Sequence, residues 1–308
     1  MFFKRNKDKA QYKTVLESIG NTPLARLTID SKADILVKLE QLNPGGSIKV
    51  RPALFMIEEA ERTGKLKPGG TIIEASSGNQ GIALAMIGAA KGYKVIITVP
   101  IGTSCEKVAT LKAYGARVIT GSPSNDPNDL NSYHAKAFAL LKDIPNSFMP
   151  NQYYNKQNPL AHYTTTGPEI WKQTNGKITH FFAGKGSCGT ISGVGKYLKE
   201  KNPNITVIAV DEDQSLQDWQ KHKTEGIGVG IESNLERSFV DDILLVSGEC
   251  AFETAKALAR DYGLLIGLSS GAVMHAVMQK SHTFSENDVV VAILADSGRA
   301  YLRKLFGC

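Results

Sequence analysis

The sequence predicts an α/β protein of two domains, each a largely parallel β-sheet flanked by helices. Short runs rich in β-branched residues alternate with longer amphipathic segments along the 308-residue chain, which is typical of strands joined by helices. This length exceeds the usual size of a single hydrophobic core and therefore favours two domains. Glycine-rich turns follow two of the predicted strands and lead into predicted helices, as in βαβ units.

The first half of the chain contains four predicted strands, at residues 35–39, 71–75, 94–99 and 117–120. Amphipathic segments at 51–64, 82–91 and 104–114 are the helices between them, and the first has Pro52 in its first turn and Gly64 at its end. Residues 121–129 are rich in Gly, Pro, Ser, Asn and Asp and predict a surface loop, followed by a helix that ends near residue 143.

The second half repeats this order of elements. A strand at 178–183, a glycine-rich turn, a helix to about residue 201 and a strand at 205–210 come first. Residues 224–235 predict a loop, and the elements 251–261, 264–268, 269–279 and 289–294 complete the fold. We therefore expect two βαβ halves joined near residues 145–165.

Composition excludes several classes of protein. Apolar residues make up 42% and charged residues 21%, which is ordinary for a globular protein and excludes disordered, collagen-like and coiled-coil chains. No apolar run approaches the roughly 20 residues of a membrane span, and the first residues, MFFKR, do not resemble a secretion signal. We expect a soluble protein with no membrane partner.

The cysteines and the net charge indicate where the protein acts and which partners it lacks. The four cysteines stand far apart without a CxxC pair, which predicts reduced thiols, no metal site and a cytoplasmic location: Cys105, Cys188, Cys250 and Cys308. The net charge of +6 is not gathered into a basic stripe interleaved with aromatic residues, so we expect no nucleic-acid partner.

Two turns have the composition of anion-binding sites. Residues 76–81 (SSGNQG) and 184–190 (GKGSCGT) each join a predicted strand to a predicted helix. Such turns present free backbone N–H groups and the positive end of the helix dipole, which bind carboxylate or phosphate. Two of them predict a set of ligands with at least two anionic groups.

The second turn also matches a dinucleotide fingerprint. Gly184, Gly186 and Gly189 spell GxGxxG between a strand and a helix, and Asp211 follows 22 residues after Gly189, at the end of the next strand. Taken alone, this pattern predicts a nicotinamide- or flavin-dependent oxidoreductase. Fold context does not decide chemistry, so the rest of the chain must choose.

Five segments in a fixed order point elsewhere: NPGGSIK (43–49), SSGNQG, GKGSCGT, GLSSGA (267–272) and ADSG (295–298). Together with Gln152 and HYTTTGPEIW (162–171), they resemble the cysteine synthase (O-acetylserine sulfhydrylase) family of fold-type II pyridoxal-phosphate enzymes, whose fold is like that of the tryptophan synthase β-subunit. The resemblance covers nearly the whole chain. It is greatest to the B-type enzymes, although GIGVG (226–230) is more like the A-type.

The resemblance implies a role for each segment. Lys49 is expected to form the Schiff base with the cofactor aldehyde and to shuttle the substrate proton. Since only a neutral amine attacks the aldehyde, this role requires a lysine with a lowered pKa. The phosphate is expected to bind at Gly186, Ser187, Cys188, Gly189 and Thr190, the ring hydroxyl at Asn79 and the pyridine nitrogen at Ser297. The residues expected to bind the substrate are Ser76, Ser77, Gly78, Gln80, Gln152 and, at the mouth of the site, Gly228.

The resemblance also implies a division of labour between the domains. Residues 40–150 are expected to form a smaller, mobile domain that carries the turn for the substrate carboxylate. Residues 1–39 and 151–308 are expected to form a larger domain that holds the pyridoxal phosphate. The implied reaction is β-replacement on O-acetyl-L-serine or O-phospho-L-serine with sulfide, giving L-cysteine, by a homodimer.

Three positions depart from the family pattern. Val50 stands where the residue after the lysine is usually acidic, Gln80 replaces a threonine, and Cys188 stands where glycine is common. Val50 and Gln80 leave open cystathionine formation, cysteine desulfhydration and a non-catalytic homologue that binds the cofactor, whereas Cys188 is interpreted as a tolerated small residue. The nicotinamide-dependent oxidoreductase also stays open at this point.

Overall fold

The computed structural model describes residues 12–76, 78–124, 126, 128–216 and 223–307, and it contains two β-sheets. The larger sheet has the strand order β1-β2-β10-β7-β8-β9, and every neighbouring pair is parallel except β1 with β2. Its strands are β1 (Leu24–Arg26), β2 (Asp34–Leu39), β10 (Val289–Leu294), β7 (His180–Gly184), β8 (Thr206–Glu212) and β9 (Asp242–Val246).

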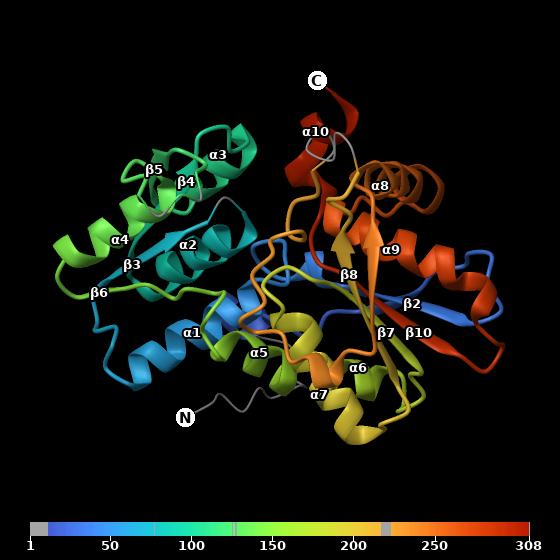
Figure 1. Cartoon of the computed structure of the whole chain (residues 1–308). Coiled ribbons are helices and arrows are strands. Elements are labelled where there is room, and N and C mark those ends of the chain that lie inside the picture. The colour runs from blue at the N-terminus through green and yellow to red at the C-terminus, as the bar shows by residue number, and fades with distance from the viewer. Residues whose placement is uncertain (1–11, 77, 125, 127, 217–222, 308) are drawn as a thin grey trace.

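The smaller sheet is parallel throughout, with the order β5-β4-β3-β6. Figure 1 shows it beside the larger sheet, in a part of the molecule built from one continuous stretch of chain. Its strands are β5 (Arg117–Gly121), β4 (Lys94–Pro100), β3 (Thr71–Ala75) and β6 (Ser147–Phe148).

Helices cover both faces of each sheet. In the larger sheet, successive residues of β8 face opposite sides: Ile208 packs in the core under α8 (Gly248–Tyr262) and α9 (Leu268–Lys280), whereas Val207 packs under α7 (Gly189–Lys201). The smaller sheet has α4 (Tyr133–Asp143) on one face, and on the other α1 (Val50–Arg62), α2 (Asn79–Lys91) and α3 (Cys105–Ala113).

Shorter helices connect these layers. A π-helical turn, η3 (His162–Thr166), joins α5 (Gln157–Ala161) to α6 (Gly167–Gln173), and α10 (Leu302–Phe306) lies near the C-terminus. The 3₁₀ turns are η1 (Val15–Ser18), η2 (Glu40–Leu42), η5 (Arg237–Phe239), η6 (Ser281–Thr283) and η7 (Gly298–Tyr301).

This architecture confirms the predicted fold class. The differences are local: β1, β6, β9, α10 and the helices at 157–173 were not predicted, and residues 264–267 contribute only an isolated bridge between Ile266 and Ser297. The helix predicted from residue 82 begins at Asn79, because Gly78 ends the turn and takes the N-cap position. Within the described residues, no helix combines the length and apolar character needed to cross a membrane.

Candidate functional site

A pocket lies between the two sheets. It is formed at the carboxyl ends of β7 and β10, next to the loop that precedes α1. It contains about 580 Å³ of empty space, counting the part open to solvent. In open α/β folds, ligands bind at this edge of the sheet. The polar or flexible residues that line it are Lys49, Asn79, Gly186, Ser187, Cys188, Gly189, Thr190, Glu225 and Ser269.

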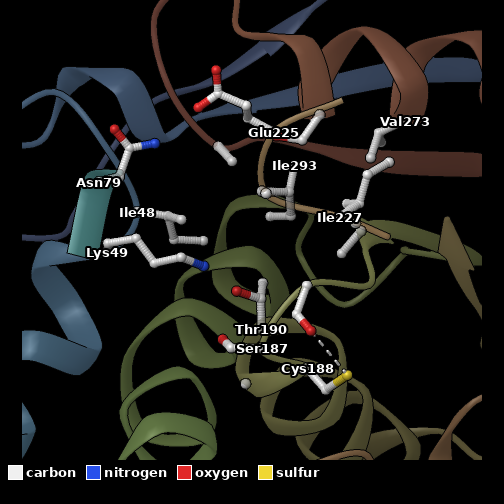
Figure 2. A pocket seen from close by; sticks show the side chains of 17 residues that line it. Ile48, Lys49, Asn79, Ser187, Cys188, Thr190, Glu225, Ile227, Val273 and Ile293 are labelled. Atoms are coloured by element: carbon white, nitrogen blue, oxygen red, sulfur yellow. Dashed lines mark hydrogen bonds between the residues drawn. The ribbon is translucent and has the colours of Figure 1, made fainter. Parts of the chain in front are cut away.

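Lys49 reaches into this pocket from the N-cap position of α1. The preceding residue is fixed to the end of β10, because the Ile48 N–H donates to the Ala295 carbonyl at 2.8 Å. Figure 2 shows the amine pointing across the pocket towards Ser187 and Thr190. Among the described residues, Nζ has no hydrogen-bond or ion-pair partner. Burial lowers the pKa of Lys49, which favours the neutral, nucleophilic amine.

The turn opposite Lys49 leads into α7 and brings the backbone close to the pocket. A Cβ atom at Gly186 would overlap the carbonyl oxygen of Gly226, and one at Gly189 would overlap the side chain of Asn158. Cys188 has a left-handed backbone with φ of 61°, which explains why glycine suits this position. Burial raises the pKa of its thiol to about 11, so Cys188 stays a neutral thiol.

These residues fit the phosphate and the aldehyde of pyridoxal phosphate. The Ser187 hydroxyl accepts from Asn158 Nδ2 at 2.9 Å, so its own proton is free to donate to a phosphate. The Thr190 hydroxyl lies 3.3 Å from Nε2 of His162, and both hydroxyls lie at the N-terminus of a 13-residue helix. Lys49, whose pKa is lowered by burial, faces this anion site across the pocket, as attack on the cofactor aldehyde requires.

Asn79 approaches the pocket from the smaller sheet, at the start of α2. Its Nδ2 donates to Asp296 Oδ2 at 2.6 Å, and the Tyr301 hydroxyl donates to the same oxygen at 2.7 Å. Burial raises the pKa of Asp296, and its Oδ1 has no partner among the described residues. The ADSG segment therefore fixes Asn79 at the edge of the pocket.

Asp211 is committed to contacts within the protein. Its Oδ2 accepts from Lys185 Nζ at 2.7 Å, and its Oδ1 accepts from the Gly228 N–H at 2.8 Å. Both oxygens thus bind groups of the protein itself, a lysine and a backbone N–H. This geometry argues against the dinucleotide interpretation of GxGxxG.

The 76–81 turn is held by its own first serine. Ser76 Oγ accepts from the N–H groups of Gly81 at 3.1 Å and Gly78 at 3.4 Å. Gln80 is 2% exposed, and neither its amide oxygen nor its amide nitrogen has a partner among the described residues. Ser77 lies outside the described residues. Of the described residues of this turn, Asn79 alone lines the pocket, and the substrate role of the turn remains a prediction.

Gln152, Gly228 and Ser297 also lie outside the pocket lining. Ser297 is the N-cap of η7, where its Oγ accepts from the Arg299 N–H, and Ser269 from the GLSSGA segment lines the pocket instead. Gly228 also lies outside the lining, whereas Gly226 belongs to it. The GLSSGA segment was noticed in the sequence without a role, and its place in the order of segments was the signal that could have identified Ser269.

A buried charge network lies directly behind Lys49. The Arg51 guanidinium donates two hydrogen bonds to Glu40 and two to Glu169, at 2.7–2.8 Å. Lys38 also donates to Glu169, at 2.8 Å. Burial raises the pKa of Glu169, but Arg51 and Lys38 outweigh it and lower that pKa to about 2. The network holds the start of α1, and hence Lys49, against β2 and α6.

A second charged contact involves Glu225, which lines the pocket. Lys107 of α3 is buried, pairs with Glu225 and lies 4.5 Å from the centre of the Tyr301 ring. It joins a helix of the smaller sheet to a loop that lines the pocket.

Val50, the residue after Lys49 that departs from the family pattern, is fully buried in the apolar core under α1 and α2, where an acidic residue would be costly.

Comparisons with known proteins agree with this geometry. A family described as "Pyridoxal-phosphate dependent enzyme" matches residues 15–296. The chain is 43% identical over 297 residues to a cysteine synthase of Staphylococcus aureus, covering 94% of both chains. It is also 43% identical to a cystathionine beta-synthase of Apis mellifera, covering 94% of this chain and 60% of that protein.

A solved structure has the same fold. The crystal structure of a hydrogen sulfide-producing enzyme from Fusobacterium nucleatum has a TM-score of 0.89 and is 39% identical, with 96% of this chain and 99% of that chain covered.

Proposed function

Because the chain belongs to the family of pyridoxal-phosphate-dependent enzymes, we propose that it catalyses β-replacement on an activated serine with sulfide, giving L-cysteine. The observation that carries this proposal is the position of Lys49: a lysine with a lowered pKa faces the Gly186–Thr190 turn across one pocket. The likeness to the Staphylococcus aureus cysteine synthase supports L-cysteine as the product. The donor, O-acetyl-L-serine or O-phospho-L-serine, is what the resemblance in sequence implies.

Each residue of the pocket has a part in this proposal. The cofactor, when bound, withdraws electrons from the carbon that carries the amino group of the substrate. Lys49 removes the proton from that α-carbon and returns it after sulfide has replaced the leaving group at the β-carbon. The backbone N–H groups of residues 186–189 and the hydroxyls of Ser187 and Thr190 bind the phosphate.

The remaining residues bind the ring and the substrate. Asn79 holds the ring hydroxyl, and the 76–81 turn and Gln152 bind the α-carboxylate of the amino acid. For the pyridine nitrogen we propose Ser269, which lines the pocket, in place of Ser297. A neutral hydroxyl there leaves the ring a weaker electron sink, which favours loss of a β-leaving group. Closing of the smaller sheet over the pocket would exclude water during these steps.

A direct assay tests the proposal. The cofactor-loaded enzyme is incubated with sulfide and each donor in turn, and cysteine is quantified. Cysteine formed from O-acetylserine or O-phosphoserine, at a rate at least a hundredfold above that from serine, supports the assignment. Cysteine formation from none of the donors contradicts it.

A second candidate is the release of sulfide from cysteine. The likeness to the Fusobacterium nucleatum enzyme favours it, and Gln80 at the substrate turn is the residue that could change donor choice. Incubation with cysteine alone, with sulfide measured, separates the two activities. If sulfide release exceeds cysteine formation under matched conditions, β-elimination is the main reaction.

We also propose that the chain acts in the cytoplasm as a homodimer. The family resemblance in the sequence implies the dimer, and the free thiols of Cys105, Cys188 and Cys250 fit a reducing compartment. Sedimentation equilibrium of the cofactor-loaded protein tests the dimer, and a mass of one chain at micromolar concentration contradicts it.

A further inference from the structure

Glu74 is a buried carboxylate inside the parallel strand β3, and it is 3% exposed. Its Oε2 accepts from the Asn151 N–H at 2.9 Å, and its Oε1 accepts from the Gln152 N–H at 3.2 Å. Among the described residues it has no ion-pair partner. Both oxygens of this buried carboxyl group thus accept hydrogen bonds from the backbone of one turn.

That turn is held from the other side as well. The Gln152 carbonyl accepts from Asn158 Nδ2 at 2.8 Å and from Asn234 Nδ2 at 3.0 Å. Asn158 Nδ2 also donates to Ser187 Oγ in the phosphate turn. The backbone of Gln152 is therefore fixed between β3 and the pocket, while its side-chain amide has no partner among the described residues.

A carboxylate is the side chain that this position requires. It is acceptor-only and can take one N–H on each oxygen, whereas an amide would turn a donor towards one of them. The arrangement has an energetic cost, because burial raises the pKa of Glu74 to about 7 although the two backbone N–H groups lower it. Packing alone would be served by an apolar side chain without this cost.

We propose that Glu74 is a positioning residue for the substrate: it sets Gln152 at a fixed place relative to the 76–81 turn, which begins two residues after it. The inference rests on the proposed function, in which Gln152 and that turn bind the α-carboxylate of the amino acid. Glu74 touches neither substrate nor cofactor and acts through the Gln152 backbone.

A double-mutant cycle on the cofactor-loaded enzyme tests the inference. Glu74→Gln, Gln152→Ala and the double variant are compared by the KM for O-acetylserine, kcat and the visible spectrum of the cofactor. We expect Glu74→Gln to raise KM about tenfold or more, with kcat within about threefold and the spectrum unchanged. Because Glu74 acts through Gln152, the double variant should be no worse than Gln152→Ala alone.

The outcomes separate this inference from the proposed function. If Gln152→Ala leaves KM unchanged, the carboxylate site itself is wrong. If Gln152→Ala raises KM and the two effects multiply in the double variant, Glu74 has a general structural role and the inference fails. Should Glu74→Gln not fold, Glu74→Asp keeps the charge and is expected to raise KM by a smaller factor. Glu61→Gln is the matched control, since its carboxylate bonds Lys91 and Tyr93 far from the pocket.

A pH profile gives a second reading. Protonation of Glu74 removes one acceptor, so KM of the wild type should rise as the pH falls through about 7, relative to Glu74→Gln. The ionisable groups facing this region are Tyr153 of the same turn and Tyr133 of α4, and burial raises the pKa of Tyr153 to about 12. Neither titrates near pH 7. Parallel profiles for the two proteins would overturn the inference.

Discussion

The replacement of Arg51 by methionine tests how strongly the charge network supports the lysine loop. Arg51 is buried and donates four hydrogen bonds to the carboxylates of Glu40 and Glu169. Methionine fills a similar space but removes the guanidinium that both Glu40 and Glu169 bind. Glu169 keeps Lys38, whereas Glu40 keeps only neutral partners, Thr22 and Asn43.

The magnitude follows from the burial of these groups. Removing one partner from a buried ion pair costs about 3–5 kcal/mol, because the remaining charge stays buried. The pKa of Glu169 gives a comparable figure: its fall from 4.5 to about 2 corresponds to roughly 3 kcal/mol in favour of the folded, charged state. This contribution is complete above about pH 4.5 and is lost as the pH falls towards 2.

Urea unfolding followed by circular dichroism measures the effect. At pH 7.5 we expect Arg51→Met to lower the free energy of unfolding by about 4 kcal/mol. The control is Arg26→Met, because Arg26 and its partner Asp34 are largely exposed, and it should cost less than about 1 kcal/mol. The reasoning is refuted if the two variants lose similar amounts of stability.

Three further predictions concern the pocket. Gly186→Ala should weaken cofactor binding at least tenfold in a dialysis titration, because the new methyl group overlaps the carbonyl of Gly226; unchanged affinity would contradict the close approach. Cys188→Val should lower thermal stability while Cys188→Gly retains cofactor binding, since a β-branched residue is strained at a φ of 61°; equal melting temperatures would count against this. Lys107→Met should lower the thermal stability and speed proteolysis near the loop of Glu225. An unchanged cleavage pattern would show that the Lys107–Glu225 ion pair does not hold this loop in place.

Most of the described strands could be predicted because they are short, nearly continuous apolar runs between turn residues. Buried parallel strands read as β-branched runs, and β3, β4, β8 and β10 all appeared within one or two residues of their predicted bounds. β9 was missed because it follows a long loop and begins with an aspartate, Asp242, directly after Asp241. The extent of α2 was misjudged because its first turn is made of polar and glycine residues, which read as a loop.

The candidate site also has parts that the sequence predicted and parts that it did not. Lys49 and the Gly186–Thr190 turn could be predicted because each lies in a contiguous segment with its own chemistry. Two features could not be predicted because they depend on how distant segments meet. They are the place of Ser269, rather than Ser297, in the pocket lining and the contact of Glu74 with Gln152, whose donor and acceptor are 78 residues apart. No local pattern carries such information, and only the assembled sheets bring these groups together.

The most direct test of the central claim is to find which residue carries the cofactor. The protein is loaded with pyridoxal phosphate, reduced with borohydride, digested and analysed by peptide mass spectrometry. The account predicts a visible absorption band before reduction, a stable adduct on Lys49, and loss of both in Lys49→Ala. An adduct on another lysine, such as Lys185, or a band that survives in Lys49→Ala, would contradict it.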